Sequence, residues 1–284
     1  MRRVLAPYLL VLPGGLWLLL FFVVPMVTML SLSLQQGDIV NGYVFTGHWQ
    51  TYLDAITAYR EQLVRSLIYG ALATVALIVI AFPVAYWIAF YGGRRKPTYL
   101  FLLLLPFFVS FVLRTISWRY ILTDDGFLLG PLKDIGVLGT SFHVLGTPFA
   151  VISGLVYNFL PFMVLPVYVA LERIDPRVVE AARDLYADPA TAFRKVILPL
   201  ALPGVFAGVL MTFVPASSDY VNSAVLGSSS TTMIGQVIQA QYLTNSDYPT
   251  ASALSFTLMF VLLIGILAYA RALGTDDVMR AAAR

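Results

Sequence analysis

Six long apolar stretches constrain the fold of this chain more than any other feature of its sequence. They run over Tyr8–Leu34, Ser66–Tyr91, Thr98–Leu122, Val144–Leu171, Val196–Pro215 and Ala251–Ala270. A helix that crosses a bilayer needs about 20 mostly apolar residues, and it satisfies all of its backbone hydrogen bonds internally. We therefore expect an all-α, polytopic membrane protein with six transmembrane helices.

The composition agrees with this expectation. Of 284 residues, 59% are apolar and only 12% are charged, whereas soluble domains carry about 25% charged residues. The first stretch is longer than the apolar region of a secretory signal, which spans about 7–15 residues, so we interpret it as a retained span. No Pro/Ser-rich linker divides the chain, and residues 1–284 are expected to form a single transmembrane domain.

The distribution of basic residues predicts which side of the membrane each connection faces. With six spans, both termini and every second connection share one side, and that side holds most of the 18 lysines and arginines. These are Arg2, Arg3, Arg94, Arg95, Lys96, Arg173, Arg177, Arg183, Arg194, Lys195, Arg271, Arg280 and Arg284. Because cytoplasmic loops are enriched in basic residues, we expect both termini to be cytoplasmic.

The connection between the fourth and fifth stretches, residues 173–195, is a compact polar insert on the same side. Asp175-Pro176 and Asp188-Pro189 each place an N-cap acceptor before a proline suited to the first helical position. Between them, one apolar stripe with helical spacing is formed by Val178, Ala181, Ala182 and Leu185. We expect two short helices that present a docking surface to a soluble partner. The alternative is an ordinary solvated loop.

The insert resembles the EAA loop of binding-protein-dependent ABC importer permeases. That pattern is E-A-A, three residues, G, nine residues, I, one residue, L-P, and it is matched by Glu180, Ala181, Ala182, Val196 (at the Ile position), Leu198 and Pro199. Tyr186 departs from it, because the family has glycine there. Tyrosine enters a left-handed turn less readily than glycine, so we expect the bend to differ or to shift to Ala187-Asp188-Pro189.

The resemblance implies a type-1 (MetI-like) permease fold in a bacterial inner membrane. It also implies that the loop contacts a cytoplasmic ATPase through Glu180, Ala181, Ala182, Arg183, Asp184, Tyr186 and Asp188. The chain itself has no G-x-x-x-x-G-K-[ST] motif for binding ATP. The implied partners are a second permease, expected to be a distinct relative, two ATPase subunits and an extracytoplasmic solute-binding protein.

Three segments are similar to the PotB-type subfamily of spermidine/putrescine permeases: Leu105–Trp118, Ser218–Val221 and Asp247–Pro249. This similarity implies a polyamine as the solute. Permeases for opines, thiamine and ferric iron share parts of the same pattern, so these solutes remain open.

Four residues are candidates for the solute path. Asp219 follows the fifth apolar stretch and could attract an amine, since ionisable groups at membrane depth usually serve function. Tyr220, Trp118 and Tyr157 could supply ring faces for cation–π contact. In the alternative interpretation, the aromatic rings anchor span ends and Asp219 only caps a helix. Arg114 and Arg119 argue against a purely cation-attracting wall, unless they pair with Asp124, Asp125 or Asp219.

Other classes of protein fit the sequence less well. An ion-coupled secondary transporter usually buries charges near the midplane, whereas these spans are almost free of charge at their centres. An enzyme is not expected, because the chain has no cysteine and its two histidines, His48 and His143, form no ligand spacing. We expect no cofactor, no metal and no binding of nucleic acid.

Overall fold

The computed structural model describes residues 11–139 and 141–272, which are mostly helical. Five helices are long and apolar enough to cross a membrane, and a bent pair can supply a sixth span. The five are Val11–Ser33, Gln50–Tyr91, Pro148–Glu172, Pro189–Ser217 and Tyr248–Arg271, and the pair is Gly93–Phe108 with Phe111–Leu122. The predicted helical membrane fold is confirmed. Some of the predicted features lie outside the described residues: the start of the first span at Tyr8, and the basic residues Arg2, Arg3, Arg280 and Arg284.

The third apolar stretch does not form one continuous helix, contrary to the single span expected over Thr98–Leu122. Helix α4 (Lys96–Leu104) tightens into a 3-10 turn at Leu105–Phe108, and α5 (Phe111–Leu122) then leaves at a bend of 88°. Val109 between them is extended, with ψ 142°. Pro106 contributes to the break, because proline has no backbone N–H to continue the helical hydrogen bonds.

The chain divides into two compact units. One contains the residues up to Arg60 together with Val237–Val261, and the other contains Glu61–Gln236 together with the chain from Leu262. Three helices belong to both units: α3 (Gln50–Tyr91), α12 (Ile234–Leu243) and α13 (Tyr248–Ala272). Helix α3 is kinked at Tyr59, next to the boundary, where φ is −116° and ψ is 20°.

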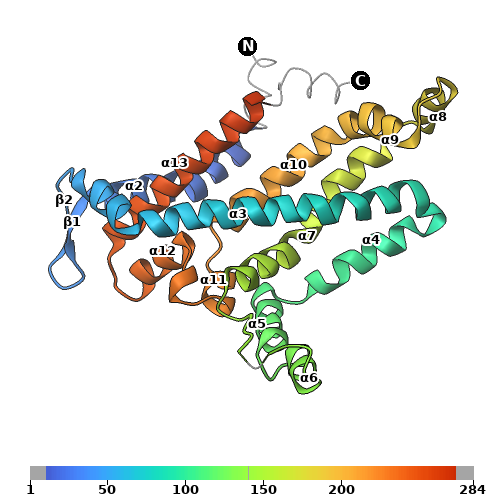
Figure 1. Ribbon diagram of the computed structural model, residues 1–284. Coiled ribbons are helices and arrows are strands. Elements are labelled where there is room, and N and C mark those ends of the chain that lie inside the picture. Colours follow the sequence, from blue (N-terminus) through green and yellow to red (C-terminus); the bar gives the residue numbers. More distant parts are fainter. Residues whose placement is uncertain (1–10, 140, 273–284) are drawn as a thin grey trace, which may run out of the picture. The chain divides into compact units, whose positions relative to one another are not determined.

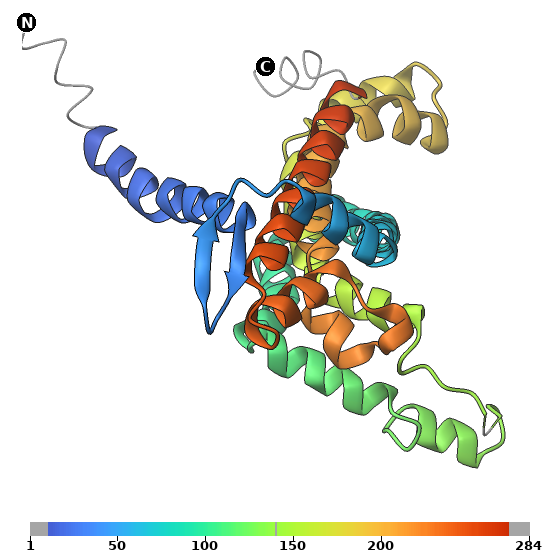
Figure 2. The same cartoon turned by 90° about the vertical axis from the view of Figure 1, so that its left-hand side faces the viewer.

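The first unit carries a β-hairpin after α2 (Val24–Ser33), and Figure 2 shows its two strands face on. Strands β1 (Gln35–Asp38) and β2 (Gly42–Phe45) pair antiparallel. The Asp38 Oδ1 atom fixes the turn by accepting hydrogen bonds from the backbone N–H groups of Val40 and Asn41, at 2.9 and 2.7 Å. The Tyr43 hydroxyl donates to the Ser246 carbonyl, so the hairpin is held to the segment before α13.

The second unit is built on close packing of α7 (Pro148–Glu172) against α10 (Leu198–Ser217), which lie side by side in Figure 1. Two glycines permit this approach. A Cβ on Gly204 would lie 2.5 Å from the Pro166 carbonyl oxygen, and one on Gly208 would lie 2.5 Å from the Met163 sulfur. Small residues are the usual means by which helices approach each other in lipid. The core also includes Leu77, Ala81, Leu155, Val167, Leu171 and Ala201.

Short helices complete the second unit at both ends of this pair. Helices α8 (Pro176–Asp184) and α9 (Pro189–Ala192) join α7 to α10 at one end (Figure 1). At the other end, α11 (Val221–Leu226) packs against α5 and α7. Helix α6 (Leu129–Asp134) lies in the connection between α5 and α7.

Candidate functional site

Residues 173–195 form two short helices, as predicted, and we call this segment the elbow. The Asp175 side chain caps α8 by accepting a hydrogen bond from the backbone N–H of Arg177, at 2.9 Å. Asp188 stands at the corresponding position before Pro189 and α9. After α9, one π-helical turn at Phe193–Ile197 leads directly into α10.

The bend between the two elbow helices lies at Tyr186, so the expected shift to residues 187–189 is wrong. Tyr186 has φ +60°, in the left-handed region, and it occupies the position where the EAA pattern has glycine. The turn persists because two hydrogen bonds close it: Tyr186 N–H to the Arg183 carbonyl at 2.9 Å, and Ala187 N–H to the Ala182 carbonyl at 3.1 Å. This is the Schellman arrangement that ends many helices. The left-handed conformation costs a non-glycine residue about 1–2 kcal/mol.

The elbow has one face toward the core and one uncovered face. Val179 packs against the core of the second unit. In contrast, Leu185 and Tyr186 are 81% and 98% exposed. The charged residues predicted to contact an ATPase are also exposed: Glu180, Arg183, Asp184 and Asp188. Ala181 is exposed and Ala182 half-buried. The predicted apolar stripe is therefore largely exposed to its surroundings, and it forms an apolar patch bordered by charged side chains.

At the other end of the second unit, a chain of buried polar side chains links α5, α7 and α11. The Asn158 amide Nδ2 donates to Thr115 Oγ1 at 3.0 Å and to Asn222 Oδ1 at 3.1 Å. The backbone N–H of Asn222 donates to Asp219 Oδ1 at 2.7 Å. All four residues are buried. We call Thr115, Asn158, Asn222 and Asp219 the polar chain.

Asp219 lies just beyond the span that ends at Ser217, and it is 8% exposed. Burial raises the pKa of its carboxyl group to about 6, although hydrogen bonds from Asn222 and Ser223 act in the opposite direction. A carboxylate that is costly to bury becomes more stable when a cation approaches it. The alternative interpretation, that Asp219 caps a helix, has support as well, because its Oδ1 accepts a hydrogen bond from the backbone N–H of Asn222, the second residue of α11.

The structure brings two of the three predicted path aromatics together. The Trp118 and Tyr157 rings meet edge to face, with centroids 5.3 Å apart. The Tyr157 ring also stacks on Phe107 at 6.4 Å, and the Arg114 guanidinium carbon lies 4.0 Å over the Phe107 ring. Tyr220 is half exposed next to Asp219, and among the described residues it makes no aromatic contact with this pair.

The ion pairs considered for Arg114 and Arg119 do not form within the described part of the chain. Asp124 pairs instead with Lys133 Nζ at 2.9 Å and His143 Nδ1 at 2.5 Å. These contacts lower the pKa of the Asp124 carboxyl group. Arg114 is held by aromatic rings, and its Nε and Nη1 atoms are buried without a hydrogen-bond partner in the described chain.

Sequence reasoning missed Thr115, Asn158 and Asn222. A signal was present for Asn158, because an amide in the middle of an apolar span usually bonds to a neighbouring helix. The partners could not be named, since they lie 43 and 64 residues away in the sequence.

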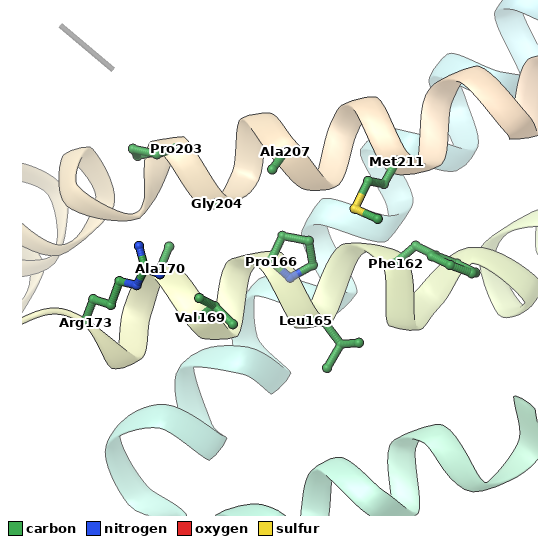
Figure 3. A pocket seen from close by; sticks show the side chains of 10 residues that line it. All are labelled: Phe162, Leu165, Pro166, Val169, Ala170, Arg173, Pro203, Gly204, Ala207 and Met211. Carbon is green, nitrogen blue, oxygen red and sulfur yellow. The ribbon is translucent and has the colours of Figure 1, made fainter. Parts of the chain in front are cut away.

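An apolar groove of about 440 Å³ lies between α7 and α10, and Figure 3 shows its lining. Phe162, Leu165, Pro166, Val169 and Ala170 come from α7, and Pro203, Gly204, Ala207 and Met211 from α10. Arg173, the first residue of the elbow, also lines the groove. None of the four predicted path residues lines this groove.

Comparison with known proteins decides the family. Residues 56–272 match the family described as "Binding-protein-dependent transport system inner membrane component". The chain belongs to this family. It is 35% identical to the spermidine/putrescine transport system permease protein PotB of Haemophilus influenzae, over 90% of each chain. The permease is thus a PotB-type, inner-membrane transport component and not an enzyme.

Two solved structures of a bacterial alginate ABC transporter contain chains of similar fold. One has a TM-score of 0.73 at 19% identity, and covers 96% of both chains. The other, a complex with an alginate-bound periplasmic protein, has a TM-score of 0.71 at 19% identity and covers 97% of this chain and 96% of that one. These matches confirm the ABC importer permease fold that the sequence predicted.

Proposed function

We propose that this permease forms one half of a polyamine path in an ATP-driven importer, and that its elbow couples the path to a cytoplasmic ATPase. The observation that carries the proposal is the uncovered face of the elbow. Leu185 and Tyr186 are almost fully exposed at a turn that two hydrogen bonds fix. An exposed apolar patch bordered by charges is typical of a surface that binds another protein.

In this proposal, Glu180, Ala181, Ala182, Arg183, Asp184, Tyr186 and Asp188 contact the ATPase or shape the surface that does. The elbow, residues 173–195, and both termini then face the cytoplasm, as the basic residues predict. Residues 1–284 act as a single transmembrane domain. ATP drives transport only if it stabilises one arrangement of the spans over another through differential contact with the permease.

The proposed solute rests on the relative and on the polar chain. The protein of H. influenzae is named for spermidine and putrescine transport. Asp219 offers a carboxylate at the end of the fifth span, and Trp118 with Tyr157 offers a paired aromatic surface on α5 and α7. Polyamines are polycations, which carboxylates and ring faces both attract. Tyr220 is proposed as a further path residue beside Asp219.

The partners follow from the same proposal. A second permease, a distinct relative, completes the path. Two ATPase subunits bind the elbows of the two permeases, and an extracytoplasmic binding protein delivers the solute. The alginate transporter of similar fold, solved with its periplasmic protein, supports the last of these.

The test is uptake of labelled spermidine into proteoliposomes that contain the permease with its cognate second permease, ATPase and binding protein. We expect uptake that requires ATP, persists without an ion gradient and is inhibited by putrescine. Absence of spermidine uptake, together with ATP-driven uptake of labelled thiamine, an opine or ferric iron, would assign a different solute. Uptake driven by an ion gradient without ATP would contradict the proposed class of transporter.

A further inference from the structure

The elbow is joined to α3 by one aromatic ring. The Phe193 ring, directly after α9, meets Phe82 at 5.6 Å and 84°, and Tyr86 at 6.0 Å and 78°. Both are edge-to-face arrangements, the geometry that aromatic pairs favour. Tyr86 packs in turn on Phe90 at 4.8 Å. Phe193 is therefore held between two rings of a different span, one helical turn apart.

The backbone is irregular at the same residue. Phe193 begins the π-helical turn Phe193–Ile197, and its carbonyl accepts the widened hydrogen bond from the backbone N–H of Leu198. Pro199 helps to explain the irregularity, because it has no N–H to donate to the carbonyl four residues earlier. Single π-turns within helices occur frequently at functional sites.

A π-turn contains one residue more than a regular α-turn. If its hydrogen bonds shift by one residue, the helix beyond it rotates by about 100° relative to the segment before it. The turn therefore allows α10 to move relative to the elbow without unfolding. The ring of Phe193 meanwhile keeps the elbow in contact with α3.

We propose that Phe193 is a positioning residue that transmits movement of the elbow to α3, and that the π-turn it begins is the joint with α10. This inference rests on the proposed function. It assigns Phe193 a role separate from docking, because the uncovered face at Glu180, Leu185 and Tyr186 does not include it.

The test compares Phe193→Ala with Phe206→Ala in the complete reconstituted transporter. Phe206 on α10 is a matched control, because its ring is also half-buried and also contacts a ring of another helix. It stacks on Tyr269 of α13 with ring centroids 5.0 Å apart. With Phe193→Ala we expect the ATPase to co-purify and to hydrolyse ATP, while solute transported per ATP falls about tenfold, the effect of losing two ring contacts. Phe193→Tyr, which keeps the ring, should restore that ratio, and Phe206→Ala should leave it unchanged.

A double-mutant cycle of Phe82→Ala and Phe193→Ala tests whether the effect comes from the contact between these two rings and not from misfolding. Phe82→Ala removes one of the two ring contacts of Phe193 and should lower the ratio of solute to ATP by less than Phe193→Ala does, and the double variant should be no worse than Phe193→Ala alone. The proposal is overturned if Phe193→Ala reduces uptake and hydrolysis in equal proportion, if it abolishes co-purification of the ATPase, or if Phe206→Ala has the same effect. Failure of the proposed function is a different result, since the unaltered transporter would then show no ATP-driven uptake at all.

Discussion

Asn158 on α7 donates from its amide Nδ2 to the Oδ1 of Asn222 on α11, across 3.1 Å. The backbone N–H of Asn222 in turn donates to Asp219. The position of the Asp219 carboxylate is thus fixed by a residue in the middle of another span. The same Asn158 side chain donates to Thr115 on α5, three residues before Trp118. One amide therefore holds the carboxylate and the aromatic pair in a fixed relation.

Asp219→Asn is expected to lower polyamine uptake about tenfold. A hydrogen bond to a charged group contributes about 1.5–3 kcal/mol to binding, and each 1.4 kcal/mol changes affinity about tenfold. Asp125→Asn, at an exposed carboxylate in the neighbouring connection, is the matched control and should transport normally. Reconstituted uptake measures both. Normal uptake with Asp219→Asn would remove this residue from the path.

The pH dependence of uptake provides a second test of Asp219. Its pKa is raised to about 6, so the carboxylate that attracts an amine is present above that pH and is lost as the pH falls through it. We expect uptake by the unaltered transporter to fall between about pH 7 and pH 5. The Asp219→Asn variant should show no such step, and a step that persists in the variant would belong to another group.

Glu180→Lys is expected to reduce uptake strongly, because it reverses a charge on the surface proposed to bind the ATPase. Glu180 is exposed, and exposed substitutions usually change stability by less than about 0.5 kcal/mol. The expected loss is therefore one of coupling. Glu61→Lys, at a side chain that is 80% exposed in α3, is the control. Undiminished uptake and substrate-stimulated ATP hydrolysis with Glu180→Lys would contradict a docking role for this face.

Tyr186→Gly and Tyr186→Val separate the shape of the turn from its side chain. Glycine accepts φ +60° freely and should stabilise the elbow by about 1 kcal/mol, whereas valine tolerates that conformation poorly. We expect the glycine variant to keep the turn and to lower uptake only by the loss of one ring from the docking face, and the valine variant, which also strains the turn, to lower uptake more. If both variants lose uptake equally, the phenol ring matters and the turn does not.

Gly204→Ala should destabilise the second unit more than Gly208→Ala. A Cβ on Gly204 would clash with the Pro166 backbone, which cannot move easily, while one on Gly208 would meet the flexible end of Met163. Overpacking of this kind costs about 1–3 kcal/mol. Thermal unfolding in detergent measures the difference, and equal melting temperatures would show that the two helices adjust more readily than their packing suggests.

The parts of the fold that depend on local sequence could be predicted. Apolar length predicted the spans, and Asp175-Pro176 predicted the start of α8, because a cap and a proline act within one turn. The break at Val109 and the hairpin after α2 were missed. A single proline in an apolar stretch does not show whether the helix will bend or end, and the hairpin is held by Tyr43 and Ser246, which lie 203 residues apart.

In the candidate site, too, features that depend on local sequence could be predicted, and features that depend on the packing of distant segments could not. Tyr186 was expected to displace the bend, but hydrogen bonds from residues 186 and 187 to α8 outweigh the intrinsic preference of tyrosine. Asp219 was recognised because a carboxylate at a span end is unusual. Its connection through Asn222 and Asn158 to Thr115 depends on how three helices pack, which spacing along the chain does not reveal.

The most direct test of the account asks where the elbow is and what covers it. The chain has no cysteine, so Glu180→Cys introduces a single reactive thiol at an exposed position. A membrane-impermeant maleimide should label it in inside-out vesicles and not in right-side-out ones, and bound ATPase should protect it. Labelling from the outer face, or labelling at the same rate with and without the ATPase, would contradict the central claim.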